Sequence, residues 1–425
     1  YANESEDITG KMTAERELVE QHGGKVAYTI GEVFSSTKLI NTALSGLPED
    51  VIRYMEGFIT KYSMEDIKKY VEKAEKLRVL VVGDVIIDRY TYCIVHGLMS
   101  KDTGYSSGLE YSEQYLGGAV AVARHLSSFT ENVTLMSIVG NEEDIRLQFL
   151  DEIADKMRLK LTYSASFPTI VKHRYLTRNA KREEYRKIFS INNIPDPMVY
   201  EEEVREEFYR GLAEKIDDFD VVFLCDFGHG LIDEKVKDLI QEKAKYLVLN
   251  CQTNSTNYGM NIITKYGRAD AFTLDQKELK LAYPMDMADE HTALAKLSLH
   301  LGCGGWLTRG AEGAYGIEGQ KIPEGQNVQK CQDRYECRNI DESLHICEYS
   351  YIHECPAFTL TVKDTVGAGD AFYSIAGLYA AAGASIELGT FMGNIAGALG
   401  ANIVGNKEAV EKVNVLKYAG TLLNI

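Results

Sequence analysis

The feature that most constrains the fold is a series of short, continuous apolar runs separated by segments with helical periodicity. From Arg78 onward, the runs predict strands at Val79–Val82, Val133–Val139, Val221–Cys225, Tyr246–Asn250, Ala271–Leu274 and Trp306–Thr308. The intervening and following segments predict helices at Ala119–Phe129, Ile145–Lys156, Glu201–Lys215, Glu234–Lys243, Gln276–Ala282, Ala293–His300, Ala371–Ala382 and Ile386–Asn402. Apolar strands that alternate with helices are typical of a parallel sheet covered on both faces. The sequence therefore predicts an α/β protein with a mostly parallel central sheet.

Four further segments do not follow this alternation of strands and helices. Polar alternation over about 88–115 and 169–191 predicts strands of a small sheet that projects from the main body. Residues 48–77 have apolar positions at helical spacing and are expected to form a helical connector. The stretch 326–356 has no clear periodicity and is interpreted as an insertion.

Composition narrows the classes of partner. The chain has 425 residues and a net charge of −17, from 46 basic and 63 acidic residues. This balance argues against a nucleic acid or an anionic membrane surface as the main partner. No apolar run approaches the roughly 18–20 residues that span a bilayer, and the start of the chain has no signal-peptide pattern. We therefore expect a cytoplasmic protein without a membrane or nucleic-acid partner.

Four cysteines cluster within the expected insertion, with His345 and His353 among them: Cys331, Cys337, Cys347 and Cys355. They are candidates for a zinc site, but the spacing lacks the tight C-x₂-C pairs of structural zinc modules. Reduced cysteines in an inserted loop are the other interpretation.

The stretch Asp364–Phe372 has the strongest chemical pattern. Gly367 and Gly369 remove side chains where the backbone must approach something closely, and a helix is expected to follow from Ala371. A helix N-terminus is an anion site, because its first N–H groups have no acceptor in the helix. Asp370 lies within that site. It is either a helix cap or a base that takes a proton from an attacking hydroxyl.

Polar residues also follow several predicted strands, where ligands of open α/β sheets bind. The strand-end residues are Asp84, Asp88, Asp226, Asn250, Asp275 and Thr308. Each could instead have a purely structural role, such as a solvated turn, an ion pair of Asp88 with an arginine, or a capping box between Asp275 and Glu278. Lys172 and Arg174 share one face of a predicted strand and either form an exposed charge pattern or hold a phosphate.

These motifs together resemble the ribokinase-like (PfkB) carbohydrate kinase family. Asp364–Phe372 resembles its D-T-x-G-A-G-D-x-F signature, and Thr308–Gly310 its T-x-G turn. Asp275–Glu278 resembles N-x-x-E with Asp in place of Asn. Gly117–Ala123 resembles G-G-x-x-x-N-x-A but lacks the Asn. The resemblance covers about 78–425 and implies a three-layer sandwich with a small β lid. It also implies ATP-dependent phosphorylation of a sugar hydroxyl.

The resemblance also implies a role for each candidate residue. Asp370 would be the catalytic base, and the backbone N–H groups of Val366–Asp370, with Gly367, Ala368 and Gly369 among them, would form the anion hole. Substrate contacts would come from Asp84, Asp88, Gly117, Gly118, Lys172 and Arg174. Nucleotide contacts would come from Asn250, Thr308, Gly310 and Asp364. Mg²⁺ would lie near Glu278, Asp275 and Asp226, with a monovalent cation near Asp364. A homodimer through the lid is also implied.

The nearest resemblance is to the kinase half of bifunctional heptose 7-phosphate kinase/nucleotidyltransferase enzymes, which share the Lys172-x-Arg174 pattern. Residues 1–47 resemble the end of a nucleotidyltransferase domain, with Gly23-Gly24 before a short strand and Ser35-Ser36 at a helix start. The resemblance therefore implies a sugar phosphate as substrate. A kinase of an unphosphorylated sugar or nucleoside, and a non-catalytic binding relative, remain as alternatives.

Overall fold

The computed structural model describes residues 16, 18–22, 24, 47–143, 145, 153–178, 185–194, 199–254, 257–284, 289–319, 352–359 and 362–425. The predicted helix Ile145–Lys156 lies mostly outside the described residues, as do most of segment 1–47 and of the expected insertion, with Cys331, Cys337, Cys347 and His345.

A nine-stranded sheet forms the centre of the molecule, in the order β13-β12-β11-β10-β9-β8-β1-β4-β5. Its strands are β1 (Val79–Gly83), β4 (Val133–Gly140), β5 (Arg158–Ser164), β8 (Val221–Asp226), β9 (Leu247–Cys251), β10 (Ala271–Asp275), β11 (Gly304–Thr308), β12 (Ala314–Ile317) and β13 (Ile352–Cys355). All neighbouring pairs are parallel except those made by β12, which is antiparallel to both β11 and β13. The prediction of a mostly parallel central sheet is confirmed.

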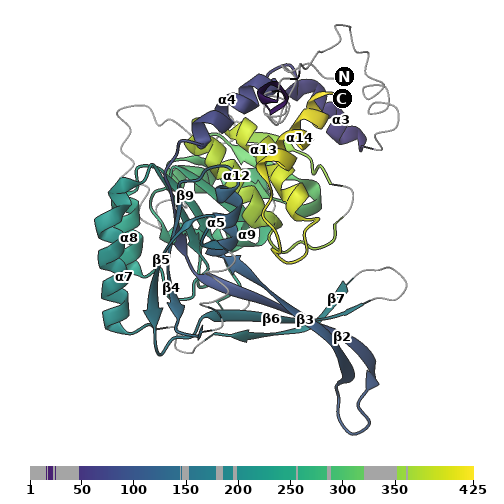
Figure 1. Ribbon diagram of the computed structural model, residues 1–425, viewed down its shortest axis with the longest axis vertical. Helices are drawn as coiled ribbons and strands as arrows, with labels where there is room; N and C mark the ends of the chain where they lie inside the picture. Colours follow the sequence, from purple (N-terminus) through teal and green to yellow (C-terminus); the bar gives the residue numbers. More distant parts are fainter. Residues whose placement is uncertain are drawn as a thin grey trace.

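Helices cover both faces of this sheet (Figure 1). The helices are α5 (Ala119–Ser127), α7 (Glu202–Lys215), α8 (Glu234–Lys243), α9 (Gln276–Ala282), α10 (Glu290–Leu301), α12 (Ala368–Ala381), α13 (Ile386–Gly400) and α14 (Lys412–Leu423). Short 3₁₀ turns occur at η2 (Ile216–Asp218), η3 (Ile263–Lys265) and η5 (Gly310–Glu312). Within the described ranges, no helix is both long and apolar enough to cross a bilayer.

Small residues let α12 pack tightly between the sheet and α13. A Cβ atom on Gly377 would lie 2.6 Å from Cγ1 of Val248 in β9. A Cβ atom on Gly393 of α13 would lie 3.0 Å from the Cβ of Ala376. Protein interiors have few voids, so this packing determines where the N-terminus of α12 lies.

A second, four-stranded sheet projects from the body in the order β3-β2-β6-β7 (Figure 1). Its strands are β2 (Val85–Leu98), β3 (Tyr105–Gly118), β6 (Ile170–Arg178) and β7 (Tyr185–Asn193). The small sheet was predicted, but its first strand begins at Val85, so Asp88 lies within a strand. We call these four strands the lid sheet.

Two helices precede the first strand, α3 (Glu49–Phe58) and α4 (Met64–Ala74). Their apolar faces enter the main core, where Met55 and Phe58 are buried and the Phe58 ring stacks on Phe391 of α13. These helices therefore pack on the body as an added layer. Near the end of the expected insertion, Ile352–Cys355 forms edge strand β13 of the central sheet, and Cys355 is buried.

Candidate active site

The polar residues predicted at strand ends lie along one edge of the central sheet. Asp84 follows β1, Asp226 ends β8, Asp275 ends β10 and Thr308 ends β11, and these strands run parallel. Helix α12 begins at the same edge. This position is shown by a hydrogen bond over 3.3 Å, which the side chain of Gln252, just after β9, donates to Oδ1 of Asp370. The sequence prediction therefore grouped these elements correctly.

The turn before α12 is locked by its glycine and by Asp364. Gly367 is the N-cap and has a left-handed φ of 85°; a Cβ atom there would lie 1.7 Å from Oδ1 of Asn406. Asp364 accepts hydrogen bonds from the Val366 and Gly405 amides, each over 3.1 Å. Only glycine fits the N-cap position. Asp364 links the turn to the loop after α13 by its hydrogen bond with Gly405.

Helix α12 begins three residues before the predicted start. Ala368 and Gly369 lie in its first turn, which the sequence pattern assigned to the loop. The Val366 amide donates to Asp364 and the Ala368 amide to the Thr365 carbonyl, so neither points to a ligand. The amides of Gly369 and Asp370 lie where helix geometry supplies no acceptor. The anion cradle is therefore smaller than predicted, and it lies at the positive end of the helix dipole.

Asp370 is poised to titrate near neutrality. Enclosure of its carboxyl by the protein, followed by the charge of Asp88, raises its pKa to about 6, against the opposing effects of Gln252 and Lys172. The group is mostly ionised at pH 7, and its basicity suits proton transfer at that pH. Sequence reasoning missed Gln252, because a hydrogen bond between residues so far apart in the chain leaves no local pattern.

Asp84 is buried without a matching partner. It is 2% exposed, and within the described residues neither of its carboxyl oxygens has a hydrogen-bond partner. Burial and the charge of Asp226 raise its pKa to about 7, while Lys172 and the nearby amides of Phe227 and His229 act in the opposite direction. An unsatisfied buried carboxyl costs about 1–3 kcal/mol or more, so this group is typical of a binding site rather than of a structural core.

The lid sheet places its charged residues over this edge. Asp88 of β2 pairs in register with Lys172 of β6, and its buried carboxylate forms an ion pair with the half-buried Arg174. The Arg174 guanidinium also lies 5.4 Å from the centre of the Tyr90 ring. Lys172 lies 5.8 Å from the centre of the Phe227 ring. The pKa of Lys172 is lowered, mainly by burial, against the opposing charges of Asp88, Asp84 and Asp370.

Gly117 and Gly118 allow close contact, but the contact is with protein atoms. A Cβ atom on Gly117 would lie 2.2 Å from Oδ2 of Asp88. A Cβ atom on Gly118, which has a φ of 60°, would lie 2.5 Å from the Asp84 carbonyl oxygen. Gly117 and Gly118 therefore leave room for the Asp88 side chain and the Asp84 backbone. The sequence prediction had assigned these two glycines a direct contact with the sugar.

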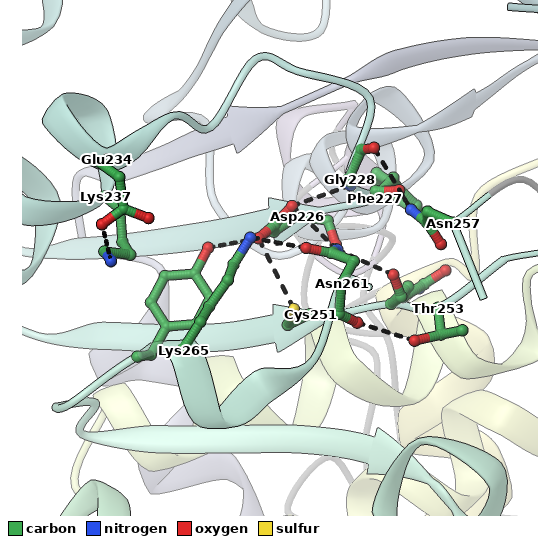
Figure 2. Close-up of polar contacts among 12 residues, drawn as sticks. Asp226, Phe227, Gly228, Glu234, Lys237, Cys251, Thr253, Asn257, Asn261 and Lys265 are labelled. Atoms are coloured by element: carbon green, nitrogen blue, oxygen red, sulfur yellow. Dashed lines mark hydrogen bonds and ion pairs between the residues drawn. The ribbon is translucent and has the colours of Figure 1, made fainter. Parts of the chain in front are cut away.

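Asp226 has a structural network that leaves little room for a metal (Figure 2). Its Oδ2 lies 2.5 Å from the Lys265 ammonium and accepts a hydrogen bond from the Tyr266 hydroxyl over 2.6 Å. Its Oδ1 accepts from the Gly228 amide over 2.9 Å and from the Asn261 side chain over 3.2 Å. Because the Lys265 ammonium already neutralises this carboxylate and each oxygen has two protein donors, we remove Asp226 from the expected metal site.

Asp275 and Glu278 form the capping box of α9, as one of the two sequence interpretations expected. The Asp275 side chain accepts from the Glu278 amide over 2.8 Å, and Glu278 accepts from the Asp275 amide over 2.9 Å. Glu278 also accepts from the Thr253 amide over 3.1 Å. Its enclosure and the charge of Asp275 raise its pKa to about 8. Among the described residues, no group of three or more His, Cys, Asp or Glu is arranged to hold a metal by itself.

The predicted nucleotide contacts lie at the same edge but have protein partners. The Asn250 side chain donates to the Thr273 carbonyl over 3.0 Å, and the Thr308 hydroxyl donates to the Leu274 carbonyl over 3.3 Å. Gly310 starts the η5 turn with a φ of 57°. These contacts stabilise the strand ends from which a nucleotide would be bound.

Sequence comparison finds relatives but no family model. No protein-family model matches the chain. The bifunctional protein HldE of Helicobacter hepaticus is 22% identical over 350 residues, which cover 81% of this chain and 64% of that protein. The D-beta-D-heptose 7-phosphate kinase of Bordetella bronchiseptica is 29% identical over 170 residues, 40% of this chain and 51% of that protein. The chain thus spans less than two thirds of the length of these relatives.

Structure comparison shows the fold. Ribokinase from Thermotoga maritima matches with a TM-score of 0.54 and 14% identity, over 81% of this chain and 99% of that chain. Phosphofructokinase-2 from Escherichia coli, in complex with substrates and products, matches with a TM-score of 0.55 and 14% identity, over 81% of this chain and 100% of that chain. The chain therefore has the ribokinase-like fold, and the resemblance to that family of sugar kinases predicted from Asp364–Phe372 is confirmed.

Proposed function

We propose that this protein transfers the γ-phosphoryl group of ATP to a hydroxyl of a sugar phosphate. The observation on which the proposal chiefly depends is Asp370, a carboxylate in the first turn of α12 with a pKa of about 6. It is electrostatically coupled to Lys172 and Asp88 of the lid sheet. A base at the positive end of a helix suits a reaction that deprotonates an alcohol beside a phosphate.

Asp370 takes the proton of the acceptor hydroxyl as the oxygen attacks the γ-phosphorus. The bond from that phosphorus to the bridging oxygen of ATP breaks, and ADP leaves with the electron pair. The amides of Gly369 and Asp370 stabilise negative charge on the transferring group, and preorganised donors of this kind are typically worth about 3–4 kcal/mol each. The transfer depends mainly on positioning and electrostatics.

Glu278 is the residue we assign to the metal. Each of its carboxyl oxygens accepts one amide hydrogen bond and keeps a second lone pair, which can bind a water molecule of a hard cation. Enclosure and the charge of Asp275 raise its pKa, and a cation nearby would favour the ionised form. Mg²⁺ would neutralise part of the phosphate charge when bound. Asp275 is the helix cap that orients Glu278. A monovalent cation near Asp364 is the second ion implied by the family likeness, and it would stabilise the turn before α12.

The acceptor we favour resembles heptose 7-phosphate. Lys172 and Arg174 lie on one face of β6, over the edge that contains Asp370, and can hold a phosphate already present on the acceptor. The relative from Bordetella bronchiseptica, named D-beta-D-heptose 7-phosphate kinase, supports this choice. We further propose that 78–425 is the kinase unit and that 1–47 is the end of a nucleotidyltransferase-like domain on a path to nucleotide-activated sugars.

An acceptor panel tests the proposal. Full-length protein with Mg²⁺-ATP is incubated with heptose 7-phosphate, fructose 6-phosphate, mannose 6-phosphate, and free ribose, fructose and adenosine, and ADP release is followed. We expect acceptor-dependent ADP release, greatest with the sugar phosphates. ADP release that no acceptor stimulates would contradict the kinase assignment.

The ion pair between Asp88 and Arg174 keeps the unphosphorylated acceptor as the second candidate, since it already neutralises one of the two cations. Replacing Lys172 and Arg174 together with Ala separates the two. If they bind phosphate, KM rises about tenfold or more for sugar phosphates and little for free sugars. Arg89→Ala, in the neighbouring lid strand, is the matched control, because Arg89 hydrogen-bonds Gln114 within the lid sheet.

The lid sheet also supports a homodimer. Its strands expose large apolar side chains, with Leu98 at 75% and Leu109 at 71% exposure, together with Ile94, Tyr111, Phe189 and Ile191. Large apolar side chains exposed together on one small sheet often mark an interaction surface. Light scattering on wild type and Leu109→Glu tests this, and a monomer for both would contradict it.

A further inference from the structure

His229 is a buried histidine that the proposed chemistry does not use. It lies in the loop after β8, has no exposed surface, and neither ring nitrogen has a hydrogen-bond partner within the part of the chain that is described. Buried polar groups are nearly always paired, because an unpaired one loses its hydration without compensation. An orphaned ring at the edge of a binding site is therefore a group that a ligand can satisfy.

The loop around His229 is held firmly in place (Figure 2). The Gly228 amide donates to Asp226, and the Asn257 side chain donates to the Phe227 carbonyl over 2.8 Å. Gly228 has a φ of 68°, and a Cβ atom there would lie 2.3 Å from Nδ2 of Asn257. The residues on which the loop depends thus fix the backbone at His229, although they offer its ring no partner.

Lys172 and Asp226 are near enough to the His229 ring to affect its charge. Burial, and then the positive charge of Lys172, lower the pKa of His229 to about 3, against the opposing effect of Asp226. The imidazole is therefore neutral at physiological pH, with one N–H donor and one nitrogen acceptor. A hydroxyl can both donate and accept, whereas a phosphate dianion offers acceptors alone. The ring is thus suited to a hydroxyl, and Lys172 to a phosphate.

Asp84 lies beside the same loop, and its carboxyl is close enough to the His229 and Phe227 amides for them to affect its charge. Neither Asp84 oxygen has a hydrogen-bond partner among the described residues. The carboxyl and the ring are therefore two buried groups at the same loop without hydrogen-bond partners among the described residues, and Lys172 acts electrostatically on both. Neighbouring hydroxyls of a polyol provide the complementary donors and acceptors.

We propose that His229 is a specificity-determining contact of the acceptor site, which binds one hydroxyl of a polyhydroxylated acceptor while Asp84 binds a neighbouring one. This inference rests on the proposed function. Both groups are closed to solvent in this structure, so the side chains that cover them must move when the acceptor enters.

The test uses His229→Phe, which keeps a ring of similar size without nitrogens, and His229→Gln, which keeps a donor and an acceptor. Each is assayed with heptose 7-phosphate and its monodeoxy analogues. For the parent acceptor, we expect kcat/KM to fall about tenfold in the Phe variant, mainly through KM, with partial recovery in the Gln variant. The monodeoxy analogue that lacks the hydroxyl bound by His229 should be used equally well by wild type and the Phe variant, because neither can make that contact.

Thermal unfolding separates a binding role from a structural one. Removing two orphaned nitrogens should leave the Tm of His229→Phe equal to that of wild type or above it. A Phe variant with unchanged kcat/KM for the parent, an equal loss with every analogue, or a large fall in Tm would each overturn the assignment. Wild type that phosphorylates no acceptor would instead refute the proposed function, and titration calorimetry with heptose 7-phosphate alone would then still report whether His229→Phe weakens binding.

Discussion

The hydrogen bond from Gln252 to Asp370 allows a quantitative prediction about the pH dependence of transfer. Asp370 acts as a base only when ionised, so activity is present above its pKa and is lost as the pH falls through about 6. Gln252 stabilises the ionised form and holds that pKa down. Replacing Gln252 with Leu should therefore shift the acid limb of the pH profile to higher pH.

The size of the shift follows from the geometry. Hydrogen bonds to charged groups contribute about 1.5–3 kcal/mol, and the distance of 3.3 Å places this one at the weak end. A loss of about 1.4 kcal/mol raises the pKa by about one unit, since one unit corresponds to about 1.36 kcal/mol. The ionised fraction at pH 6 then falls from about one half to about one tenth, a loss of about fivefold, while at pH 7.5 the rate changes by less than about 1.5-fold.

The assay is kcat/KM for the best acceptor from pH 5 to 9 at saturating Mg²⁺-ATP. Gln252→Glu should shift the acid limb further, because a second carboxylate beside Asp370 disfavours its ionised form. Gln241→Leu is the matched control, as Gln241 binds the Gly267 and Arg268 amides. An acid limb that stays in place in Gln252→Leu, or moves to lower pH, would refute the assignment of Asp370 as the titrating base.

Three other predictions concern the frame of the site. Gly367→Ala should reduce transfer at least about tenfold, because its Cβ would collide with Asn406 at a left-handed φ; normal kcat would contradict this. Asp226→Asn should lower the unfolding free energy by about 3–5 kcal/mol in a denaturant titration, since it leaves the Lys265 charge without its partner; a value within about 0.5 kcal/mol of wild type would refute the structural role. Glu278→Gln should raise the Mg²⁺ concentration needed for half-maximal rate, and an unchanged Mg²⁺ titration would remove Glu278 from the metal site.

Much of the fold was predictable because buried parallel strands have a strong local signal. The predicted Val221–Cys225 and Ala271–Leu274 each differ from the observed strand by one residue. The strands that were not predicted, β5, β12 and β13, lie at or next to the sheet edges. Edge strands are partly exposed, and β12 has only four residues, so their apolar pattern is weak.

The site was predictable only in part. The placement of Asp370 at a helix start and of Asp84 at a strand end was predictable, because both positions are visible in the sequence. Asp226 was misjudged because its partner Lys265 lies on a separate turn, so the ion pair leaves no local pattern. The hydrogen bond of Gln252 to Asp370 and the unpaired environment of His229 among the described residues were missed for the same reason. Their roles depend on which distant groups surround them.

The central assignment is tested most directly by comparing acceptor-dependent ADP release in wild type and Asp370→Asn. The variant keeps the size of the side chain and a hydrogen-bond acceptor for Gln252, but it cannot take up the proton of the hydroxyl. General-base catalysis contributes about 10²–10⁴-fold, so we expect kcat to fall by that factor with the Tm preserved. Wild-type kcat in Asp370→Asn, with every sugar phosphate that the wild type accepts, would contradict the assignment.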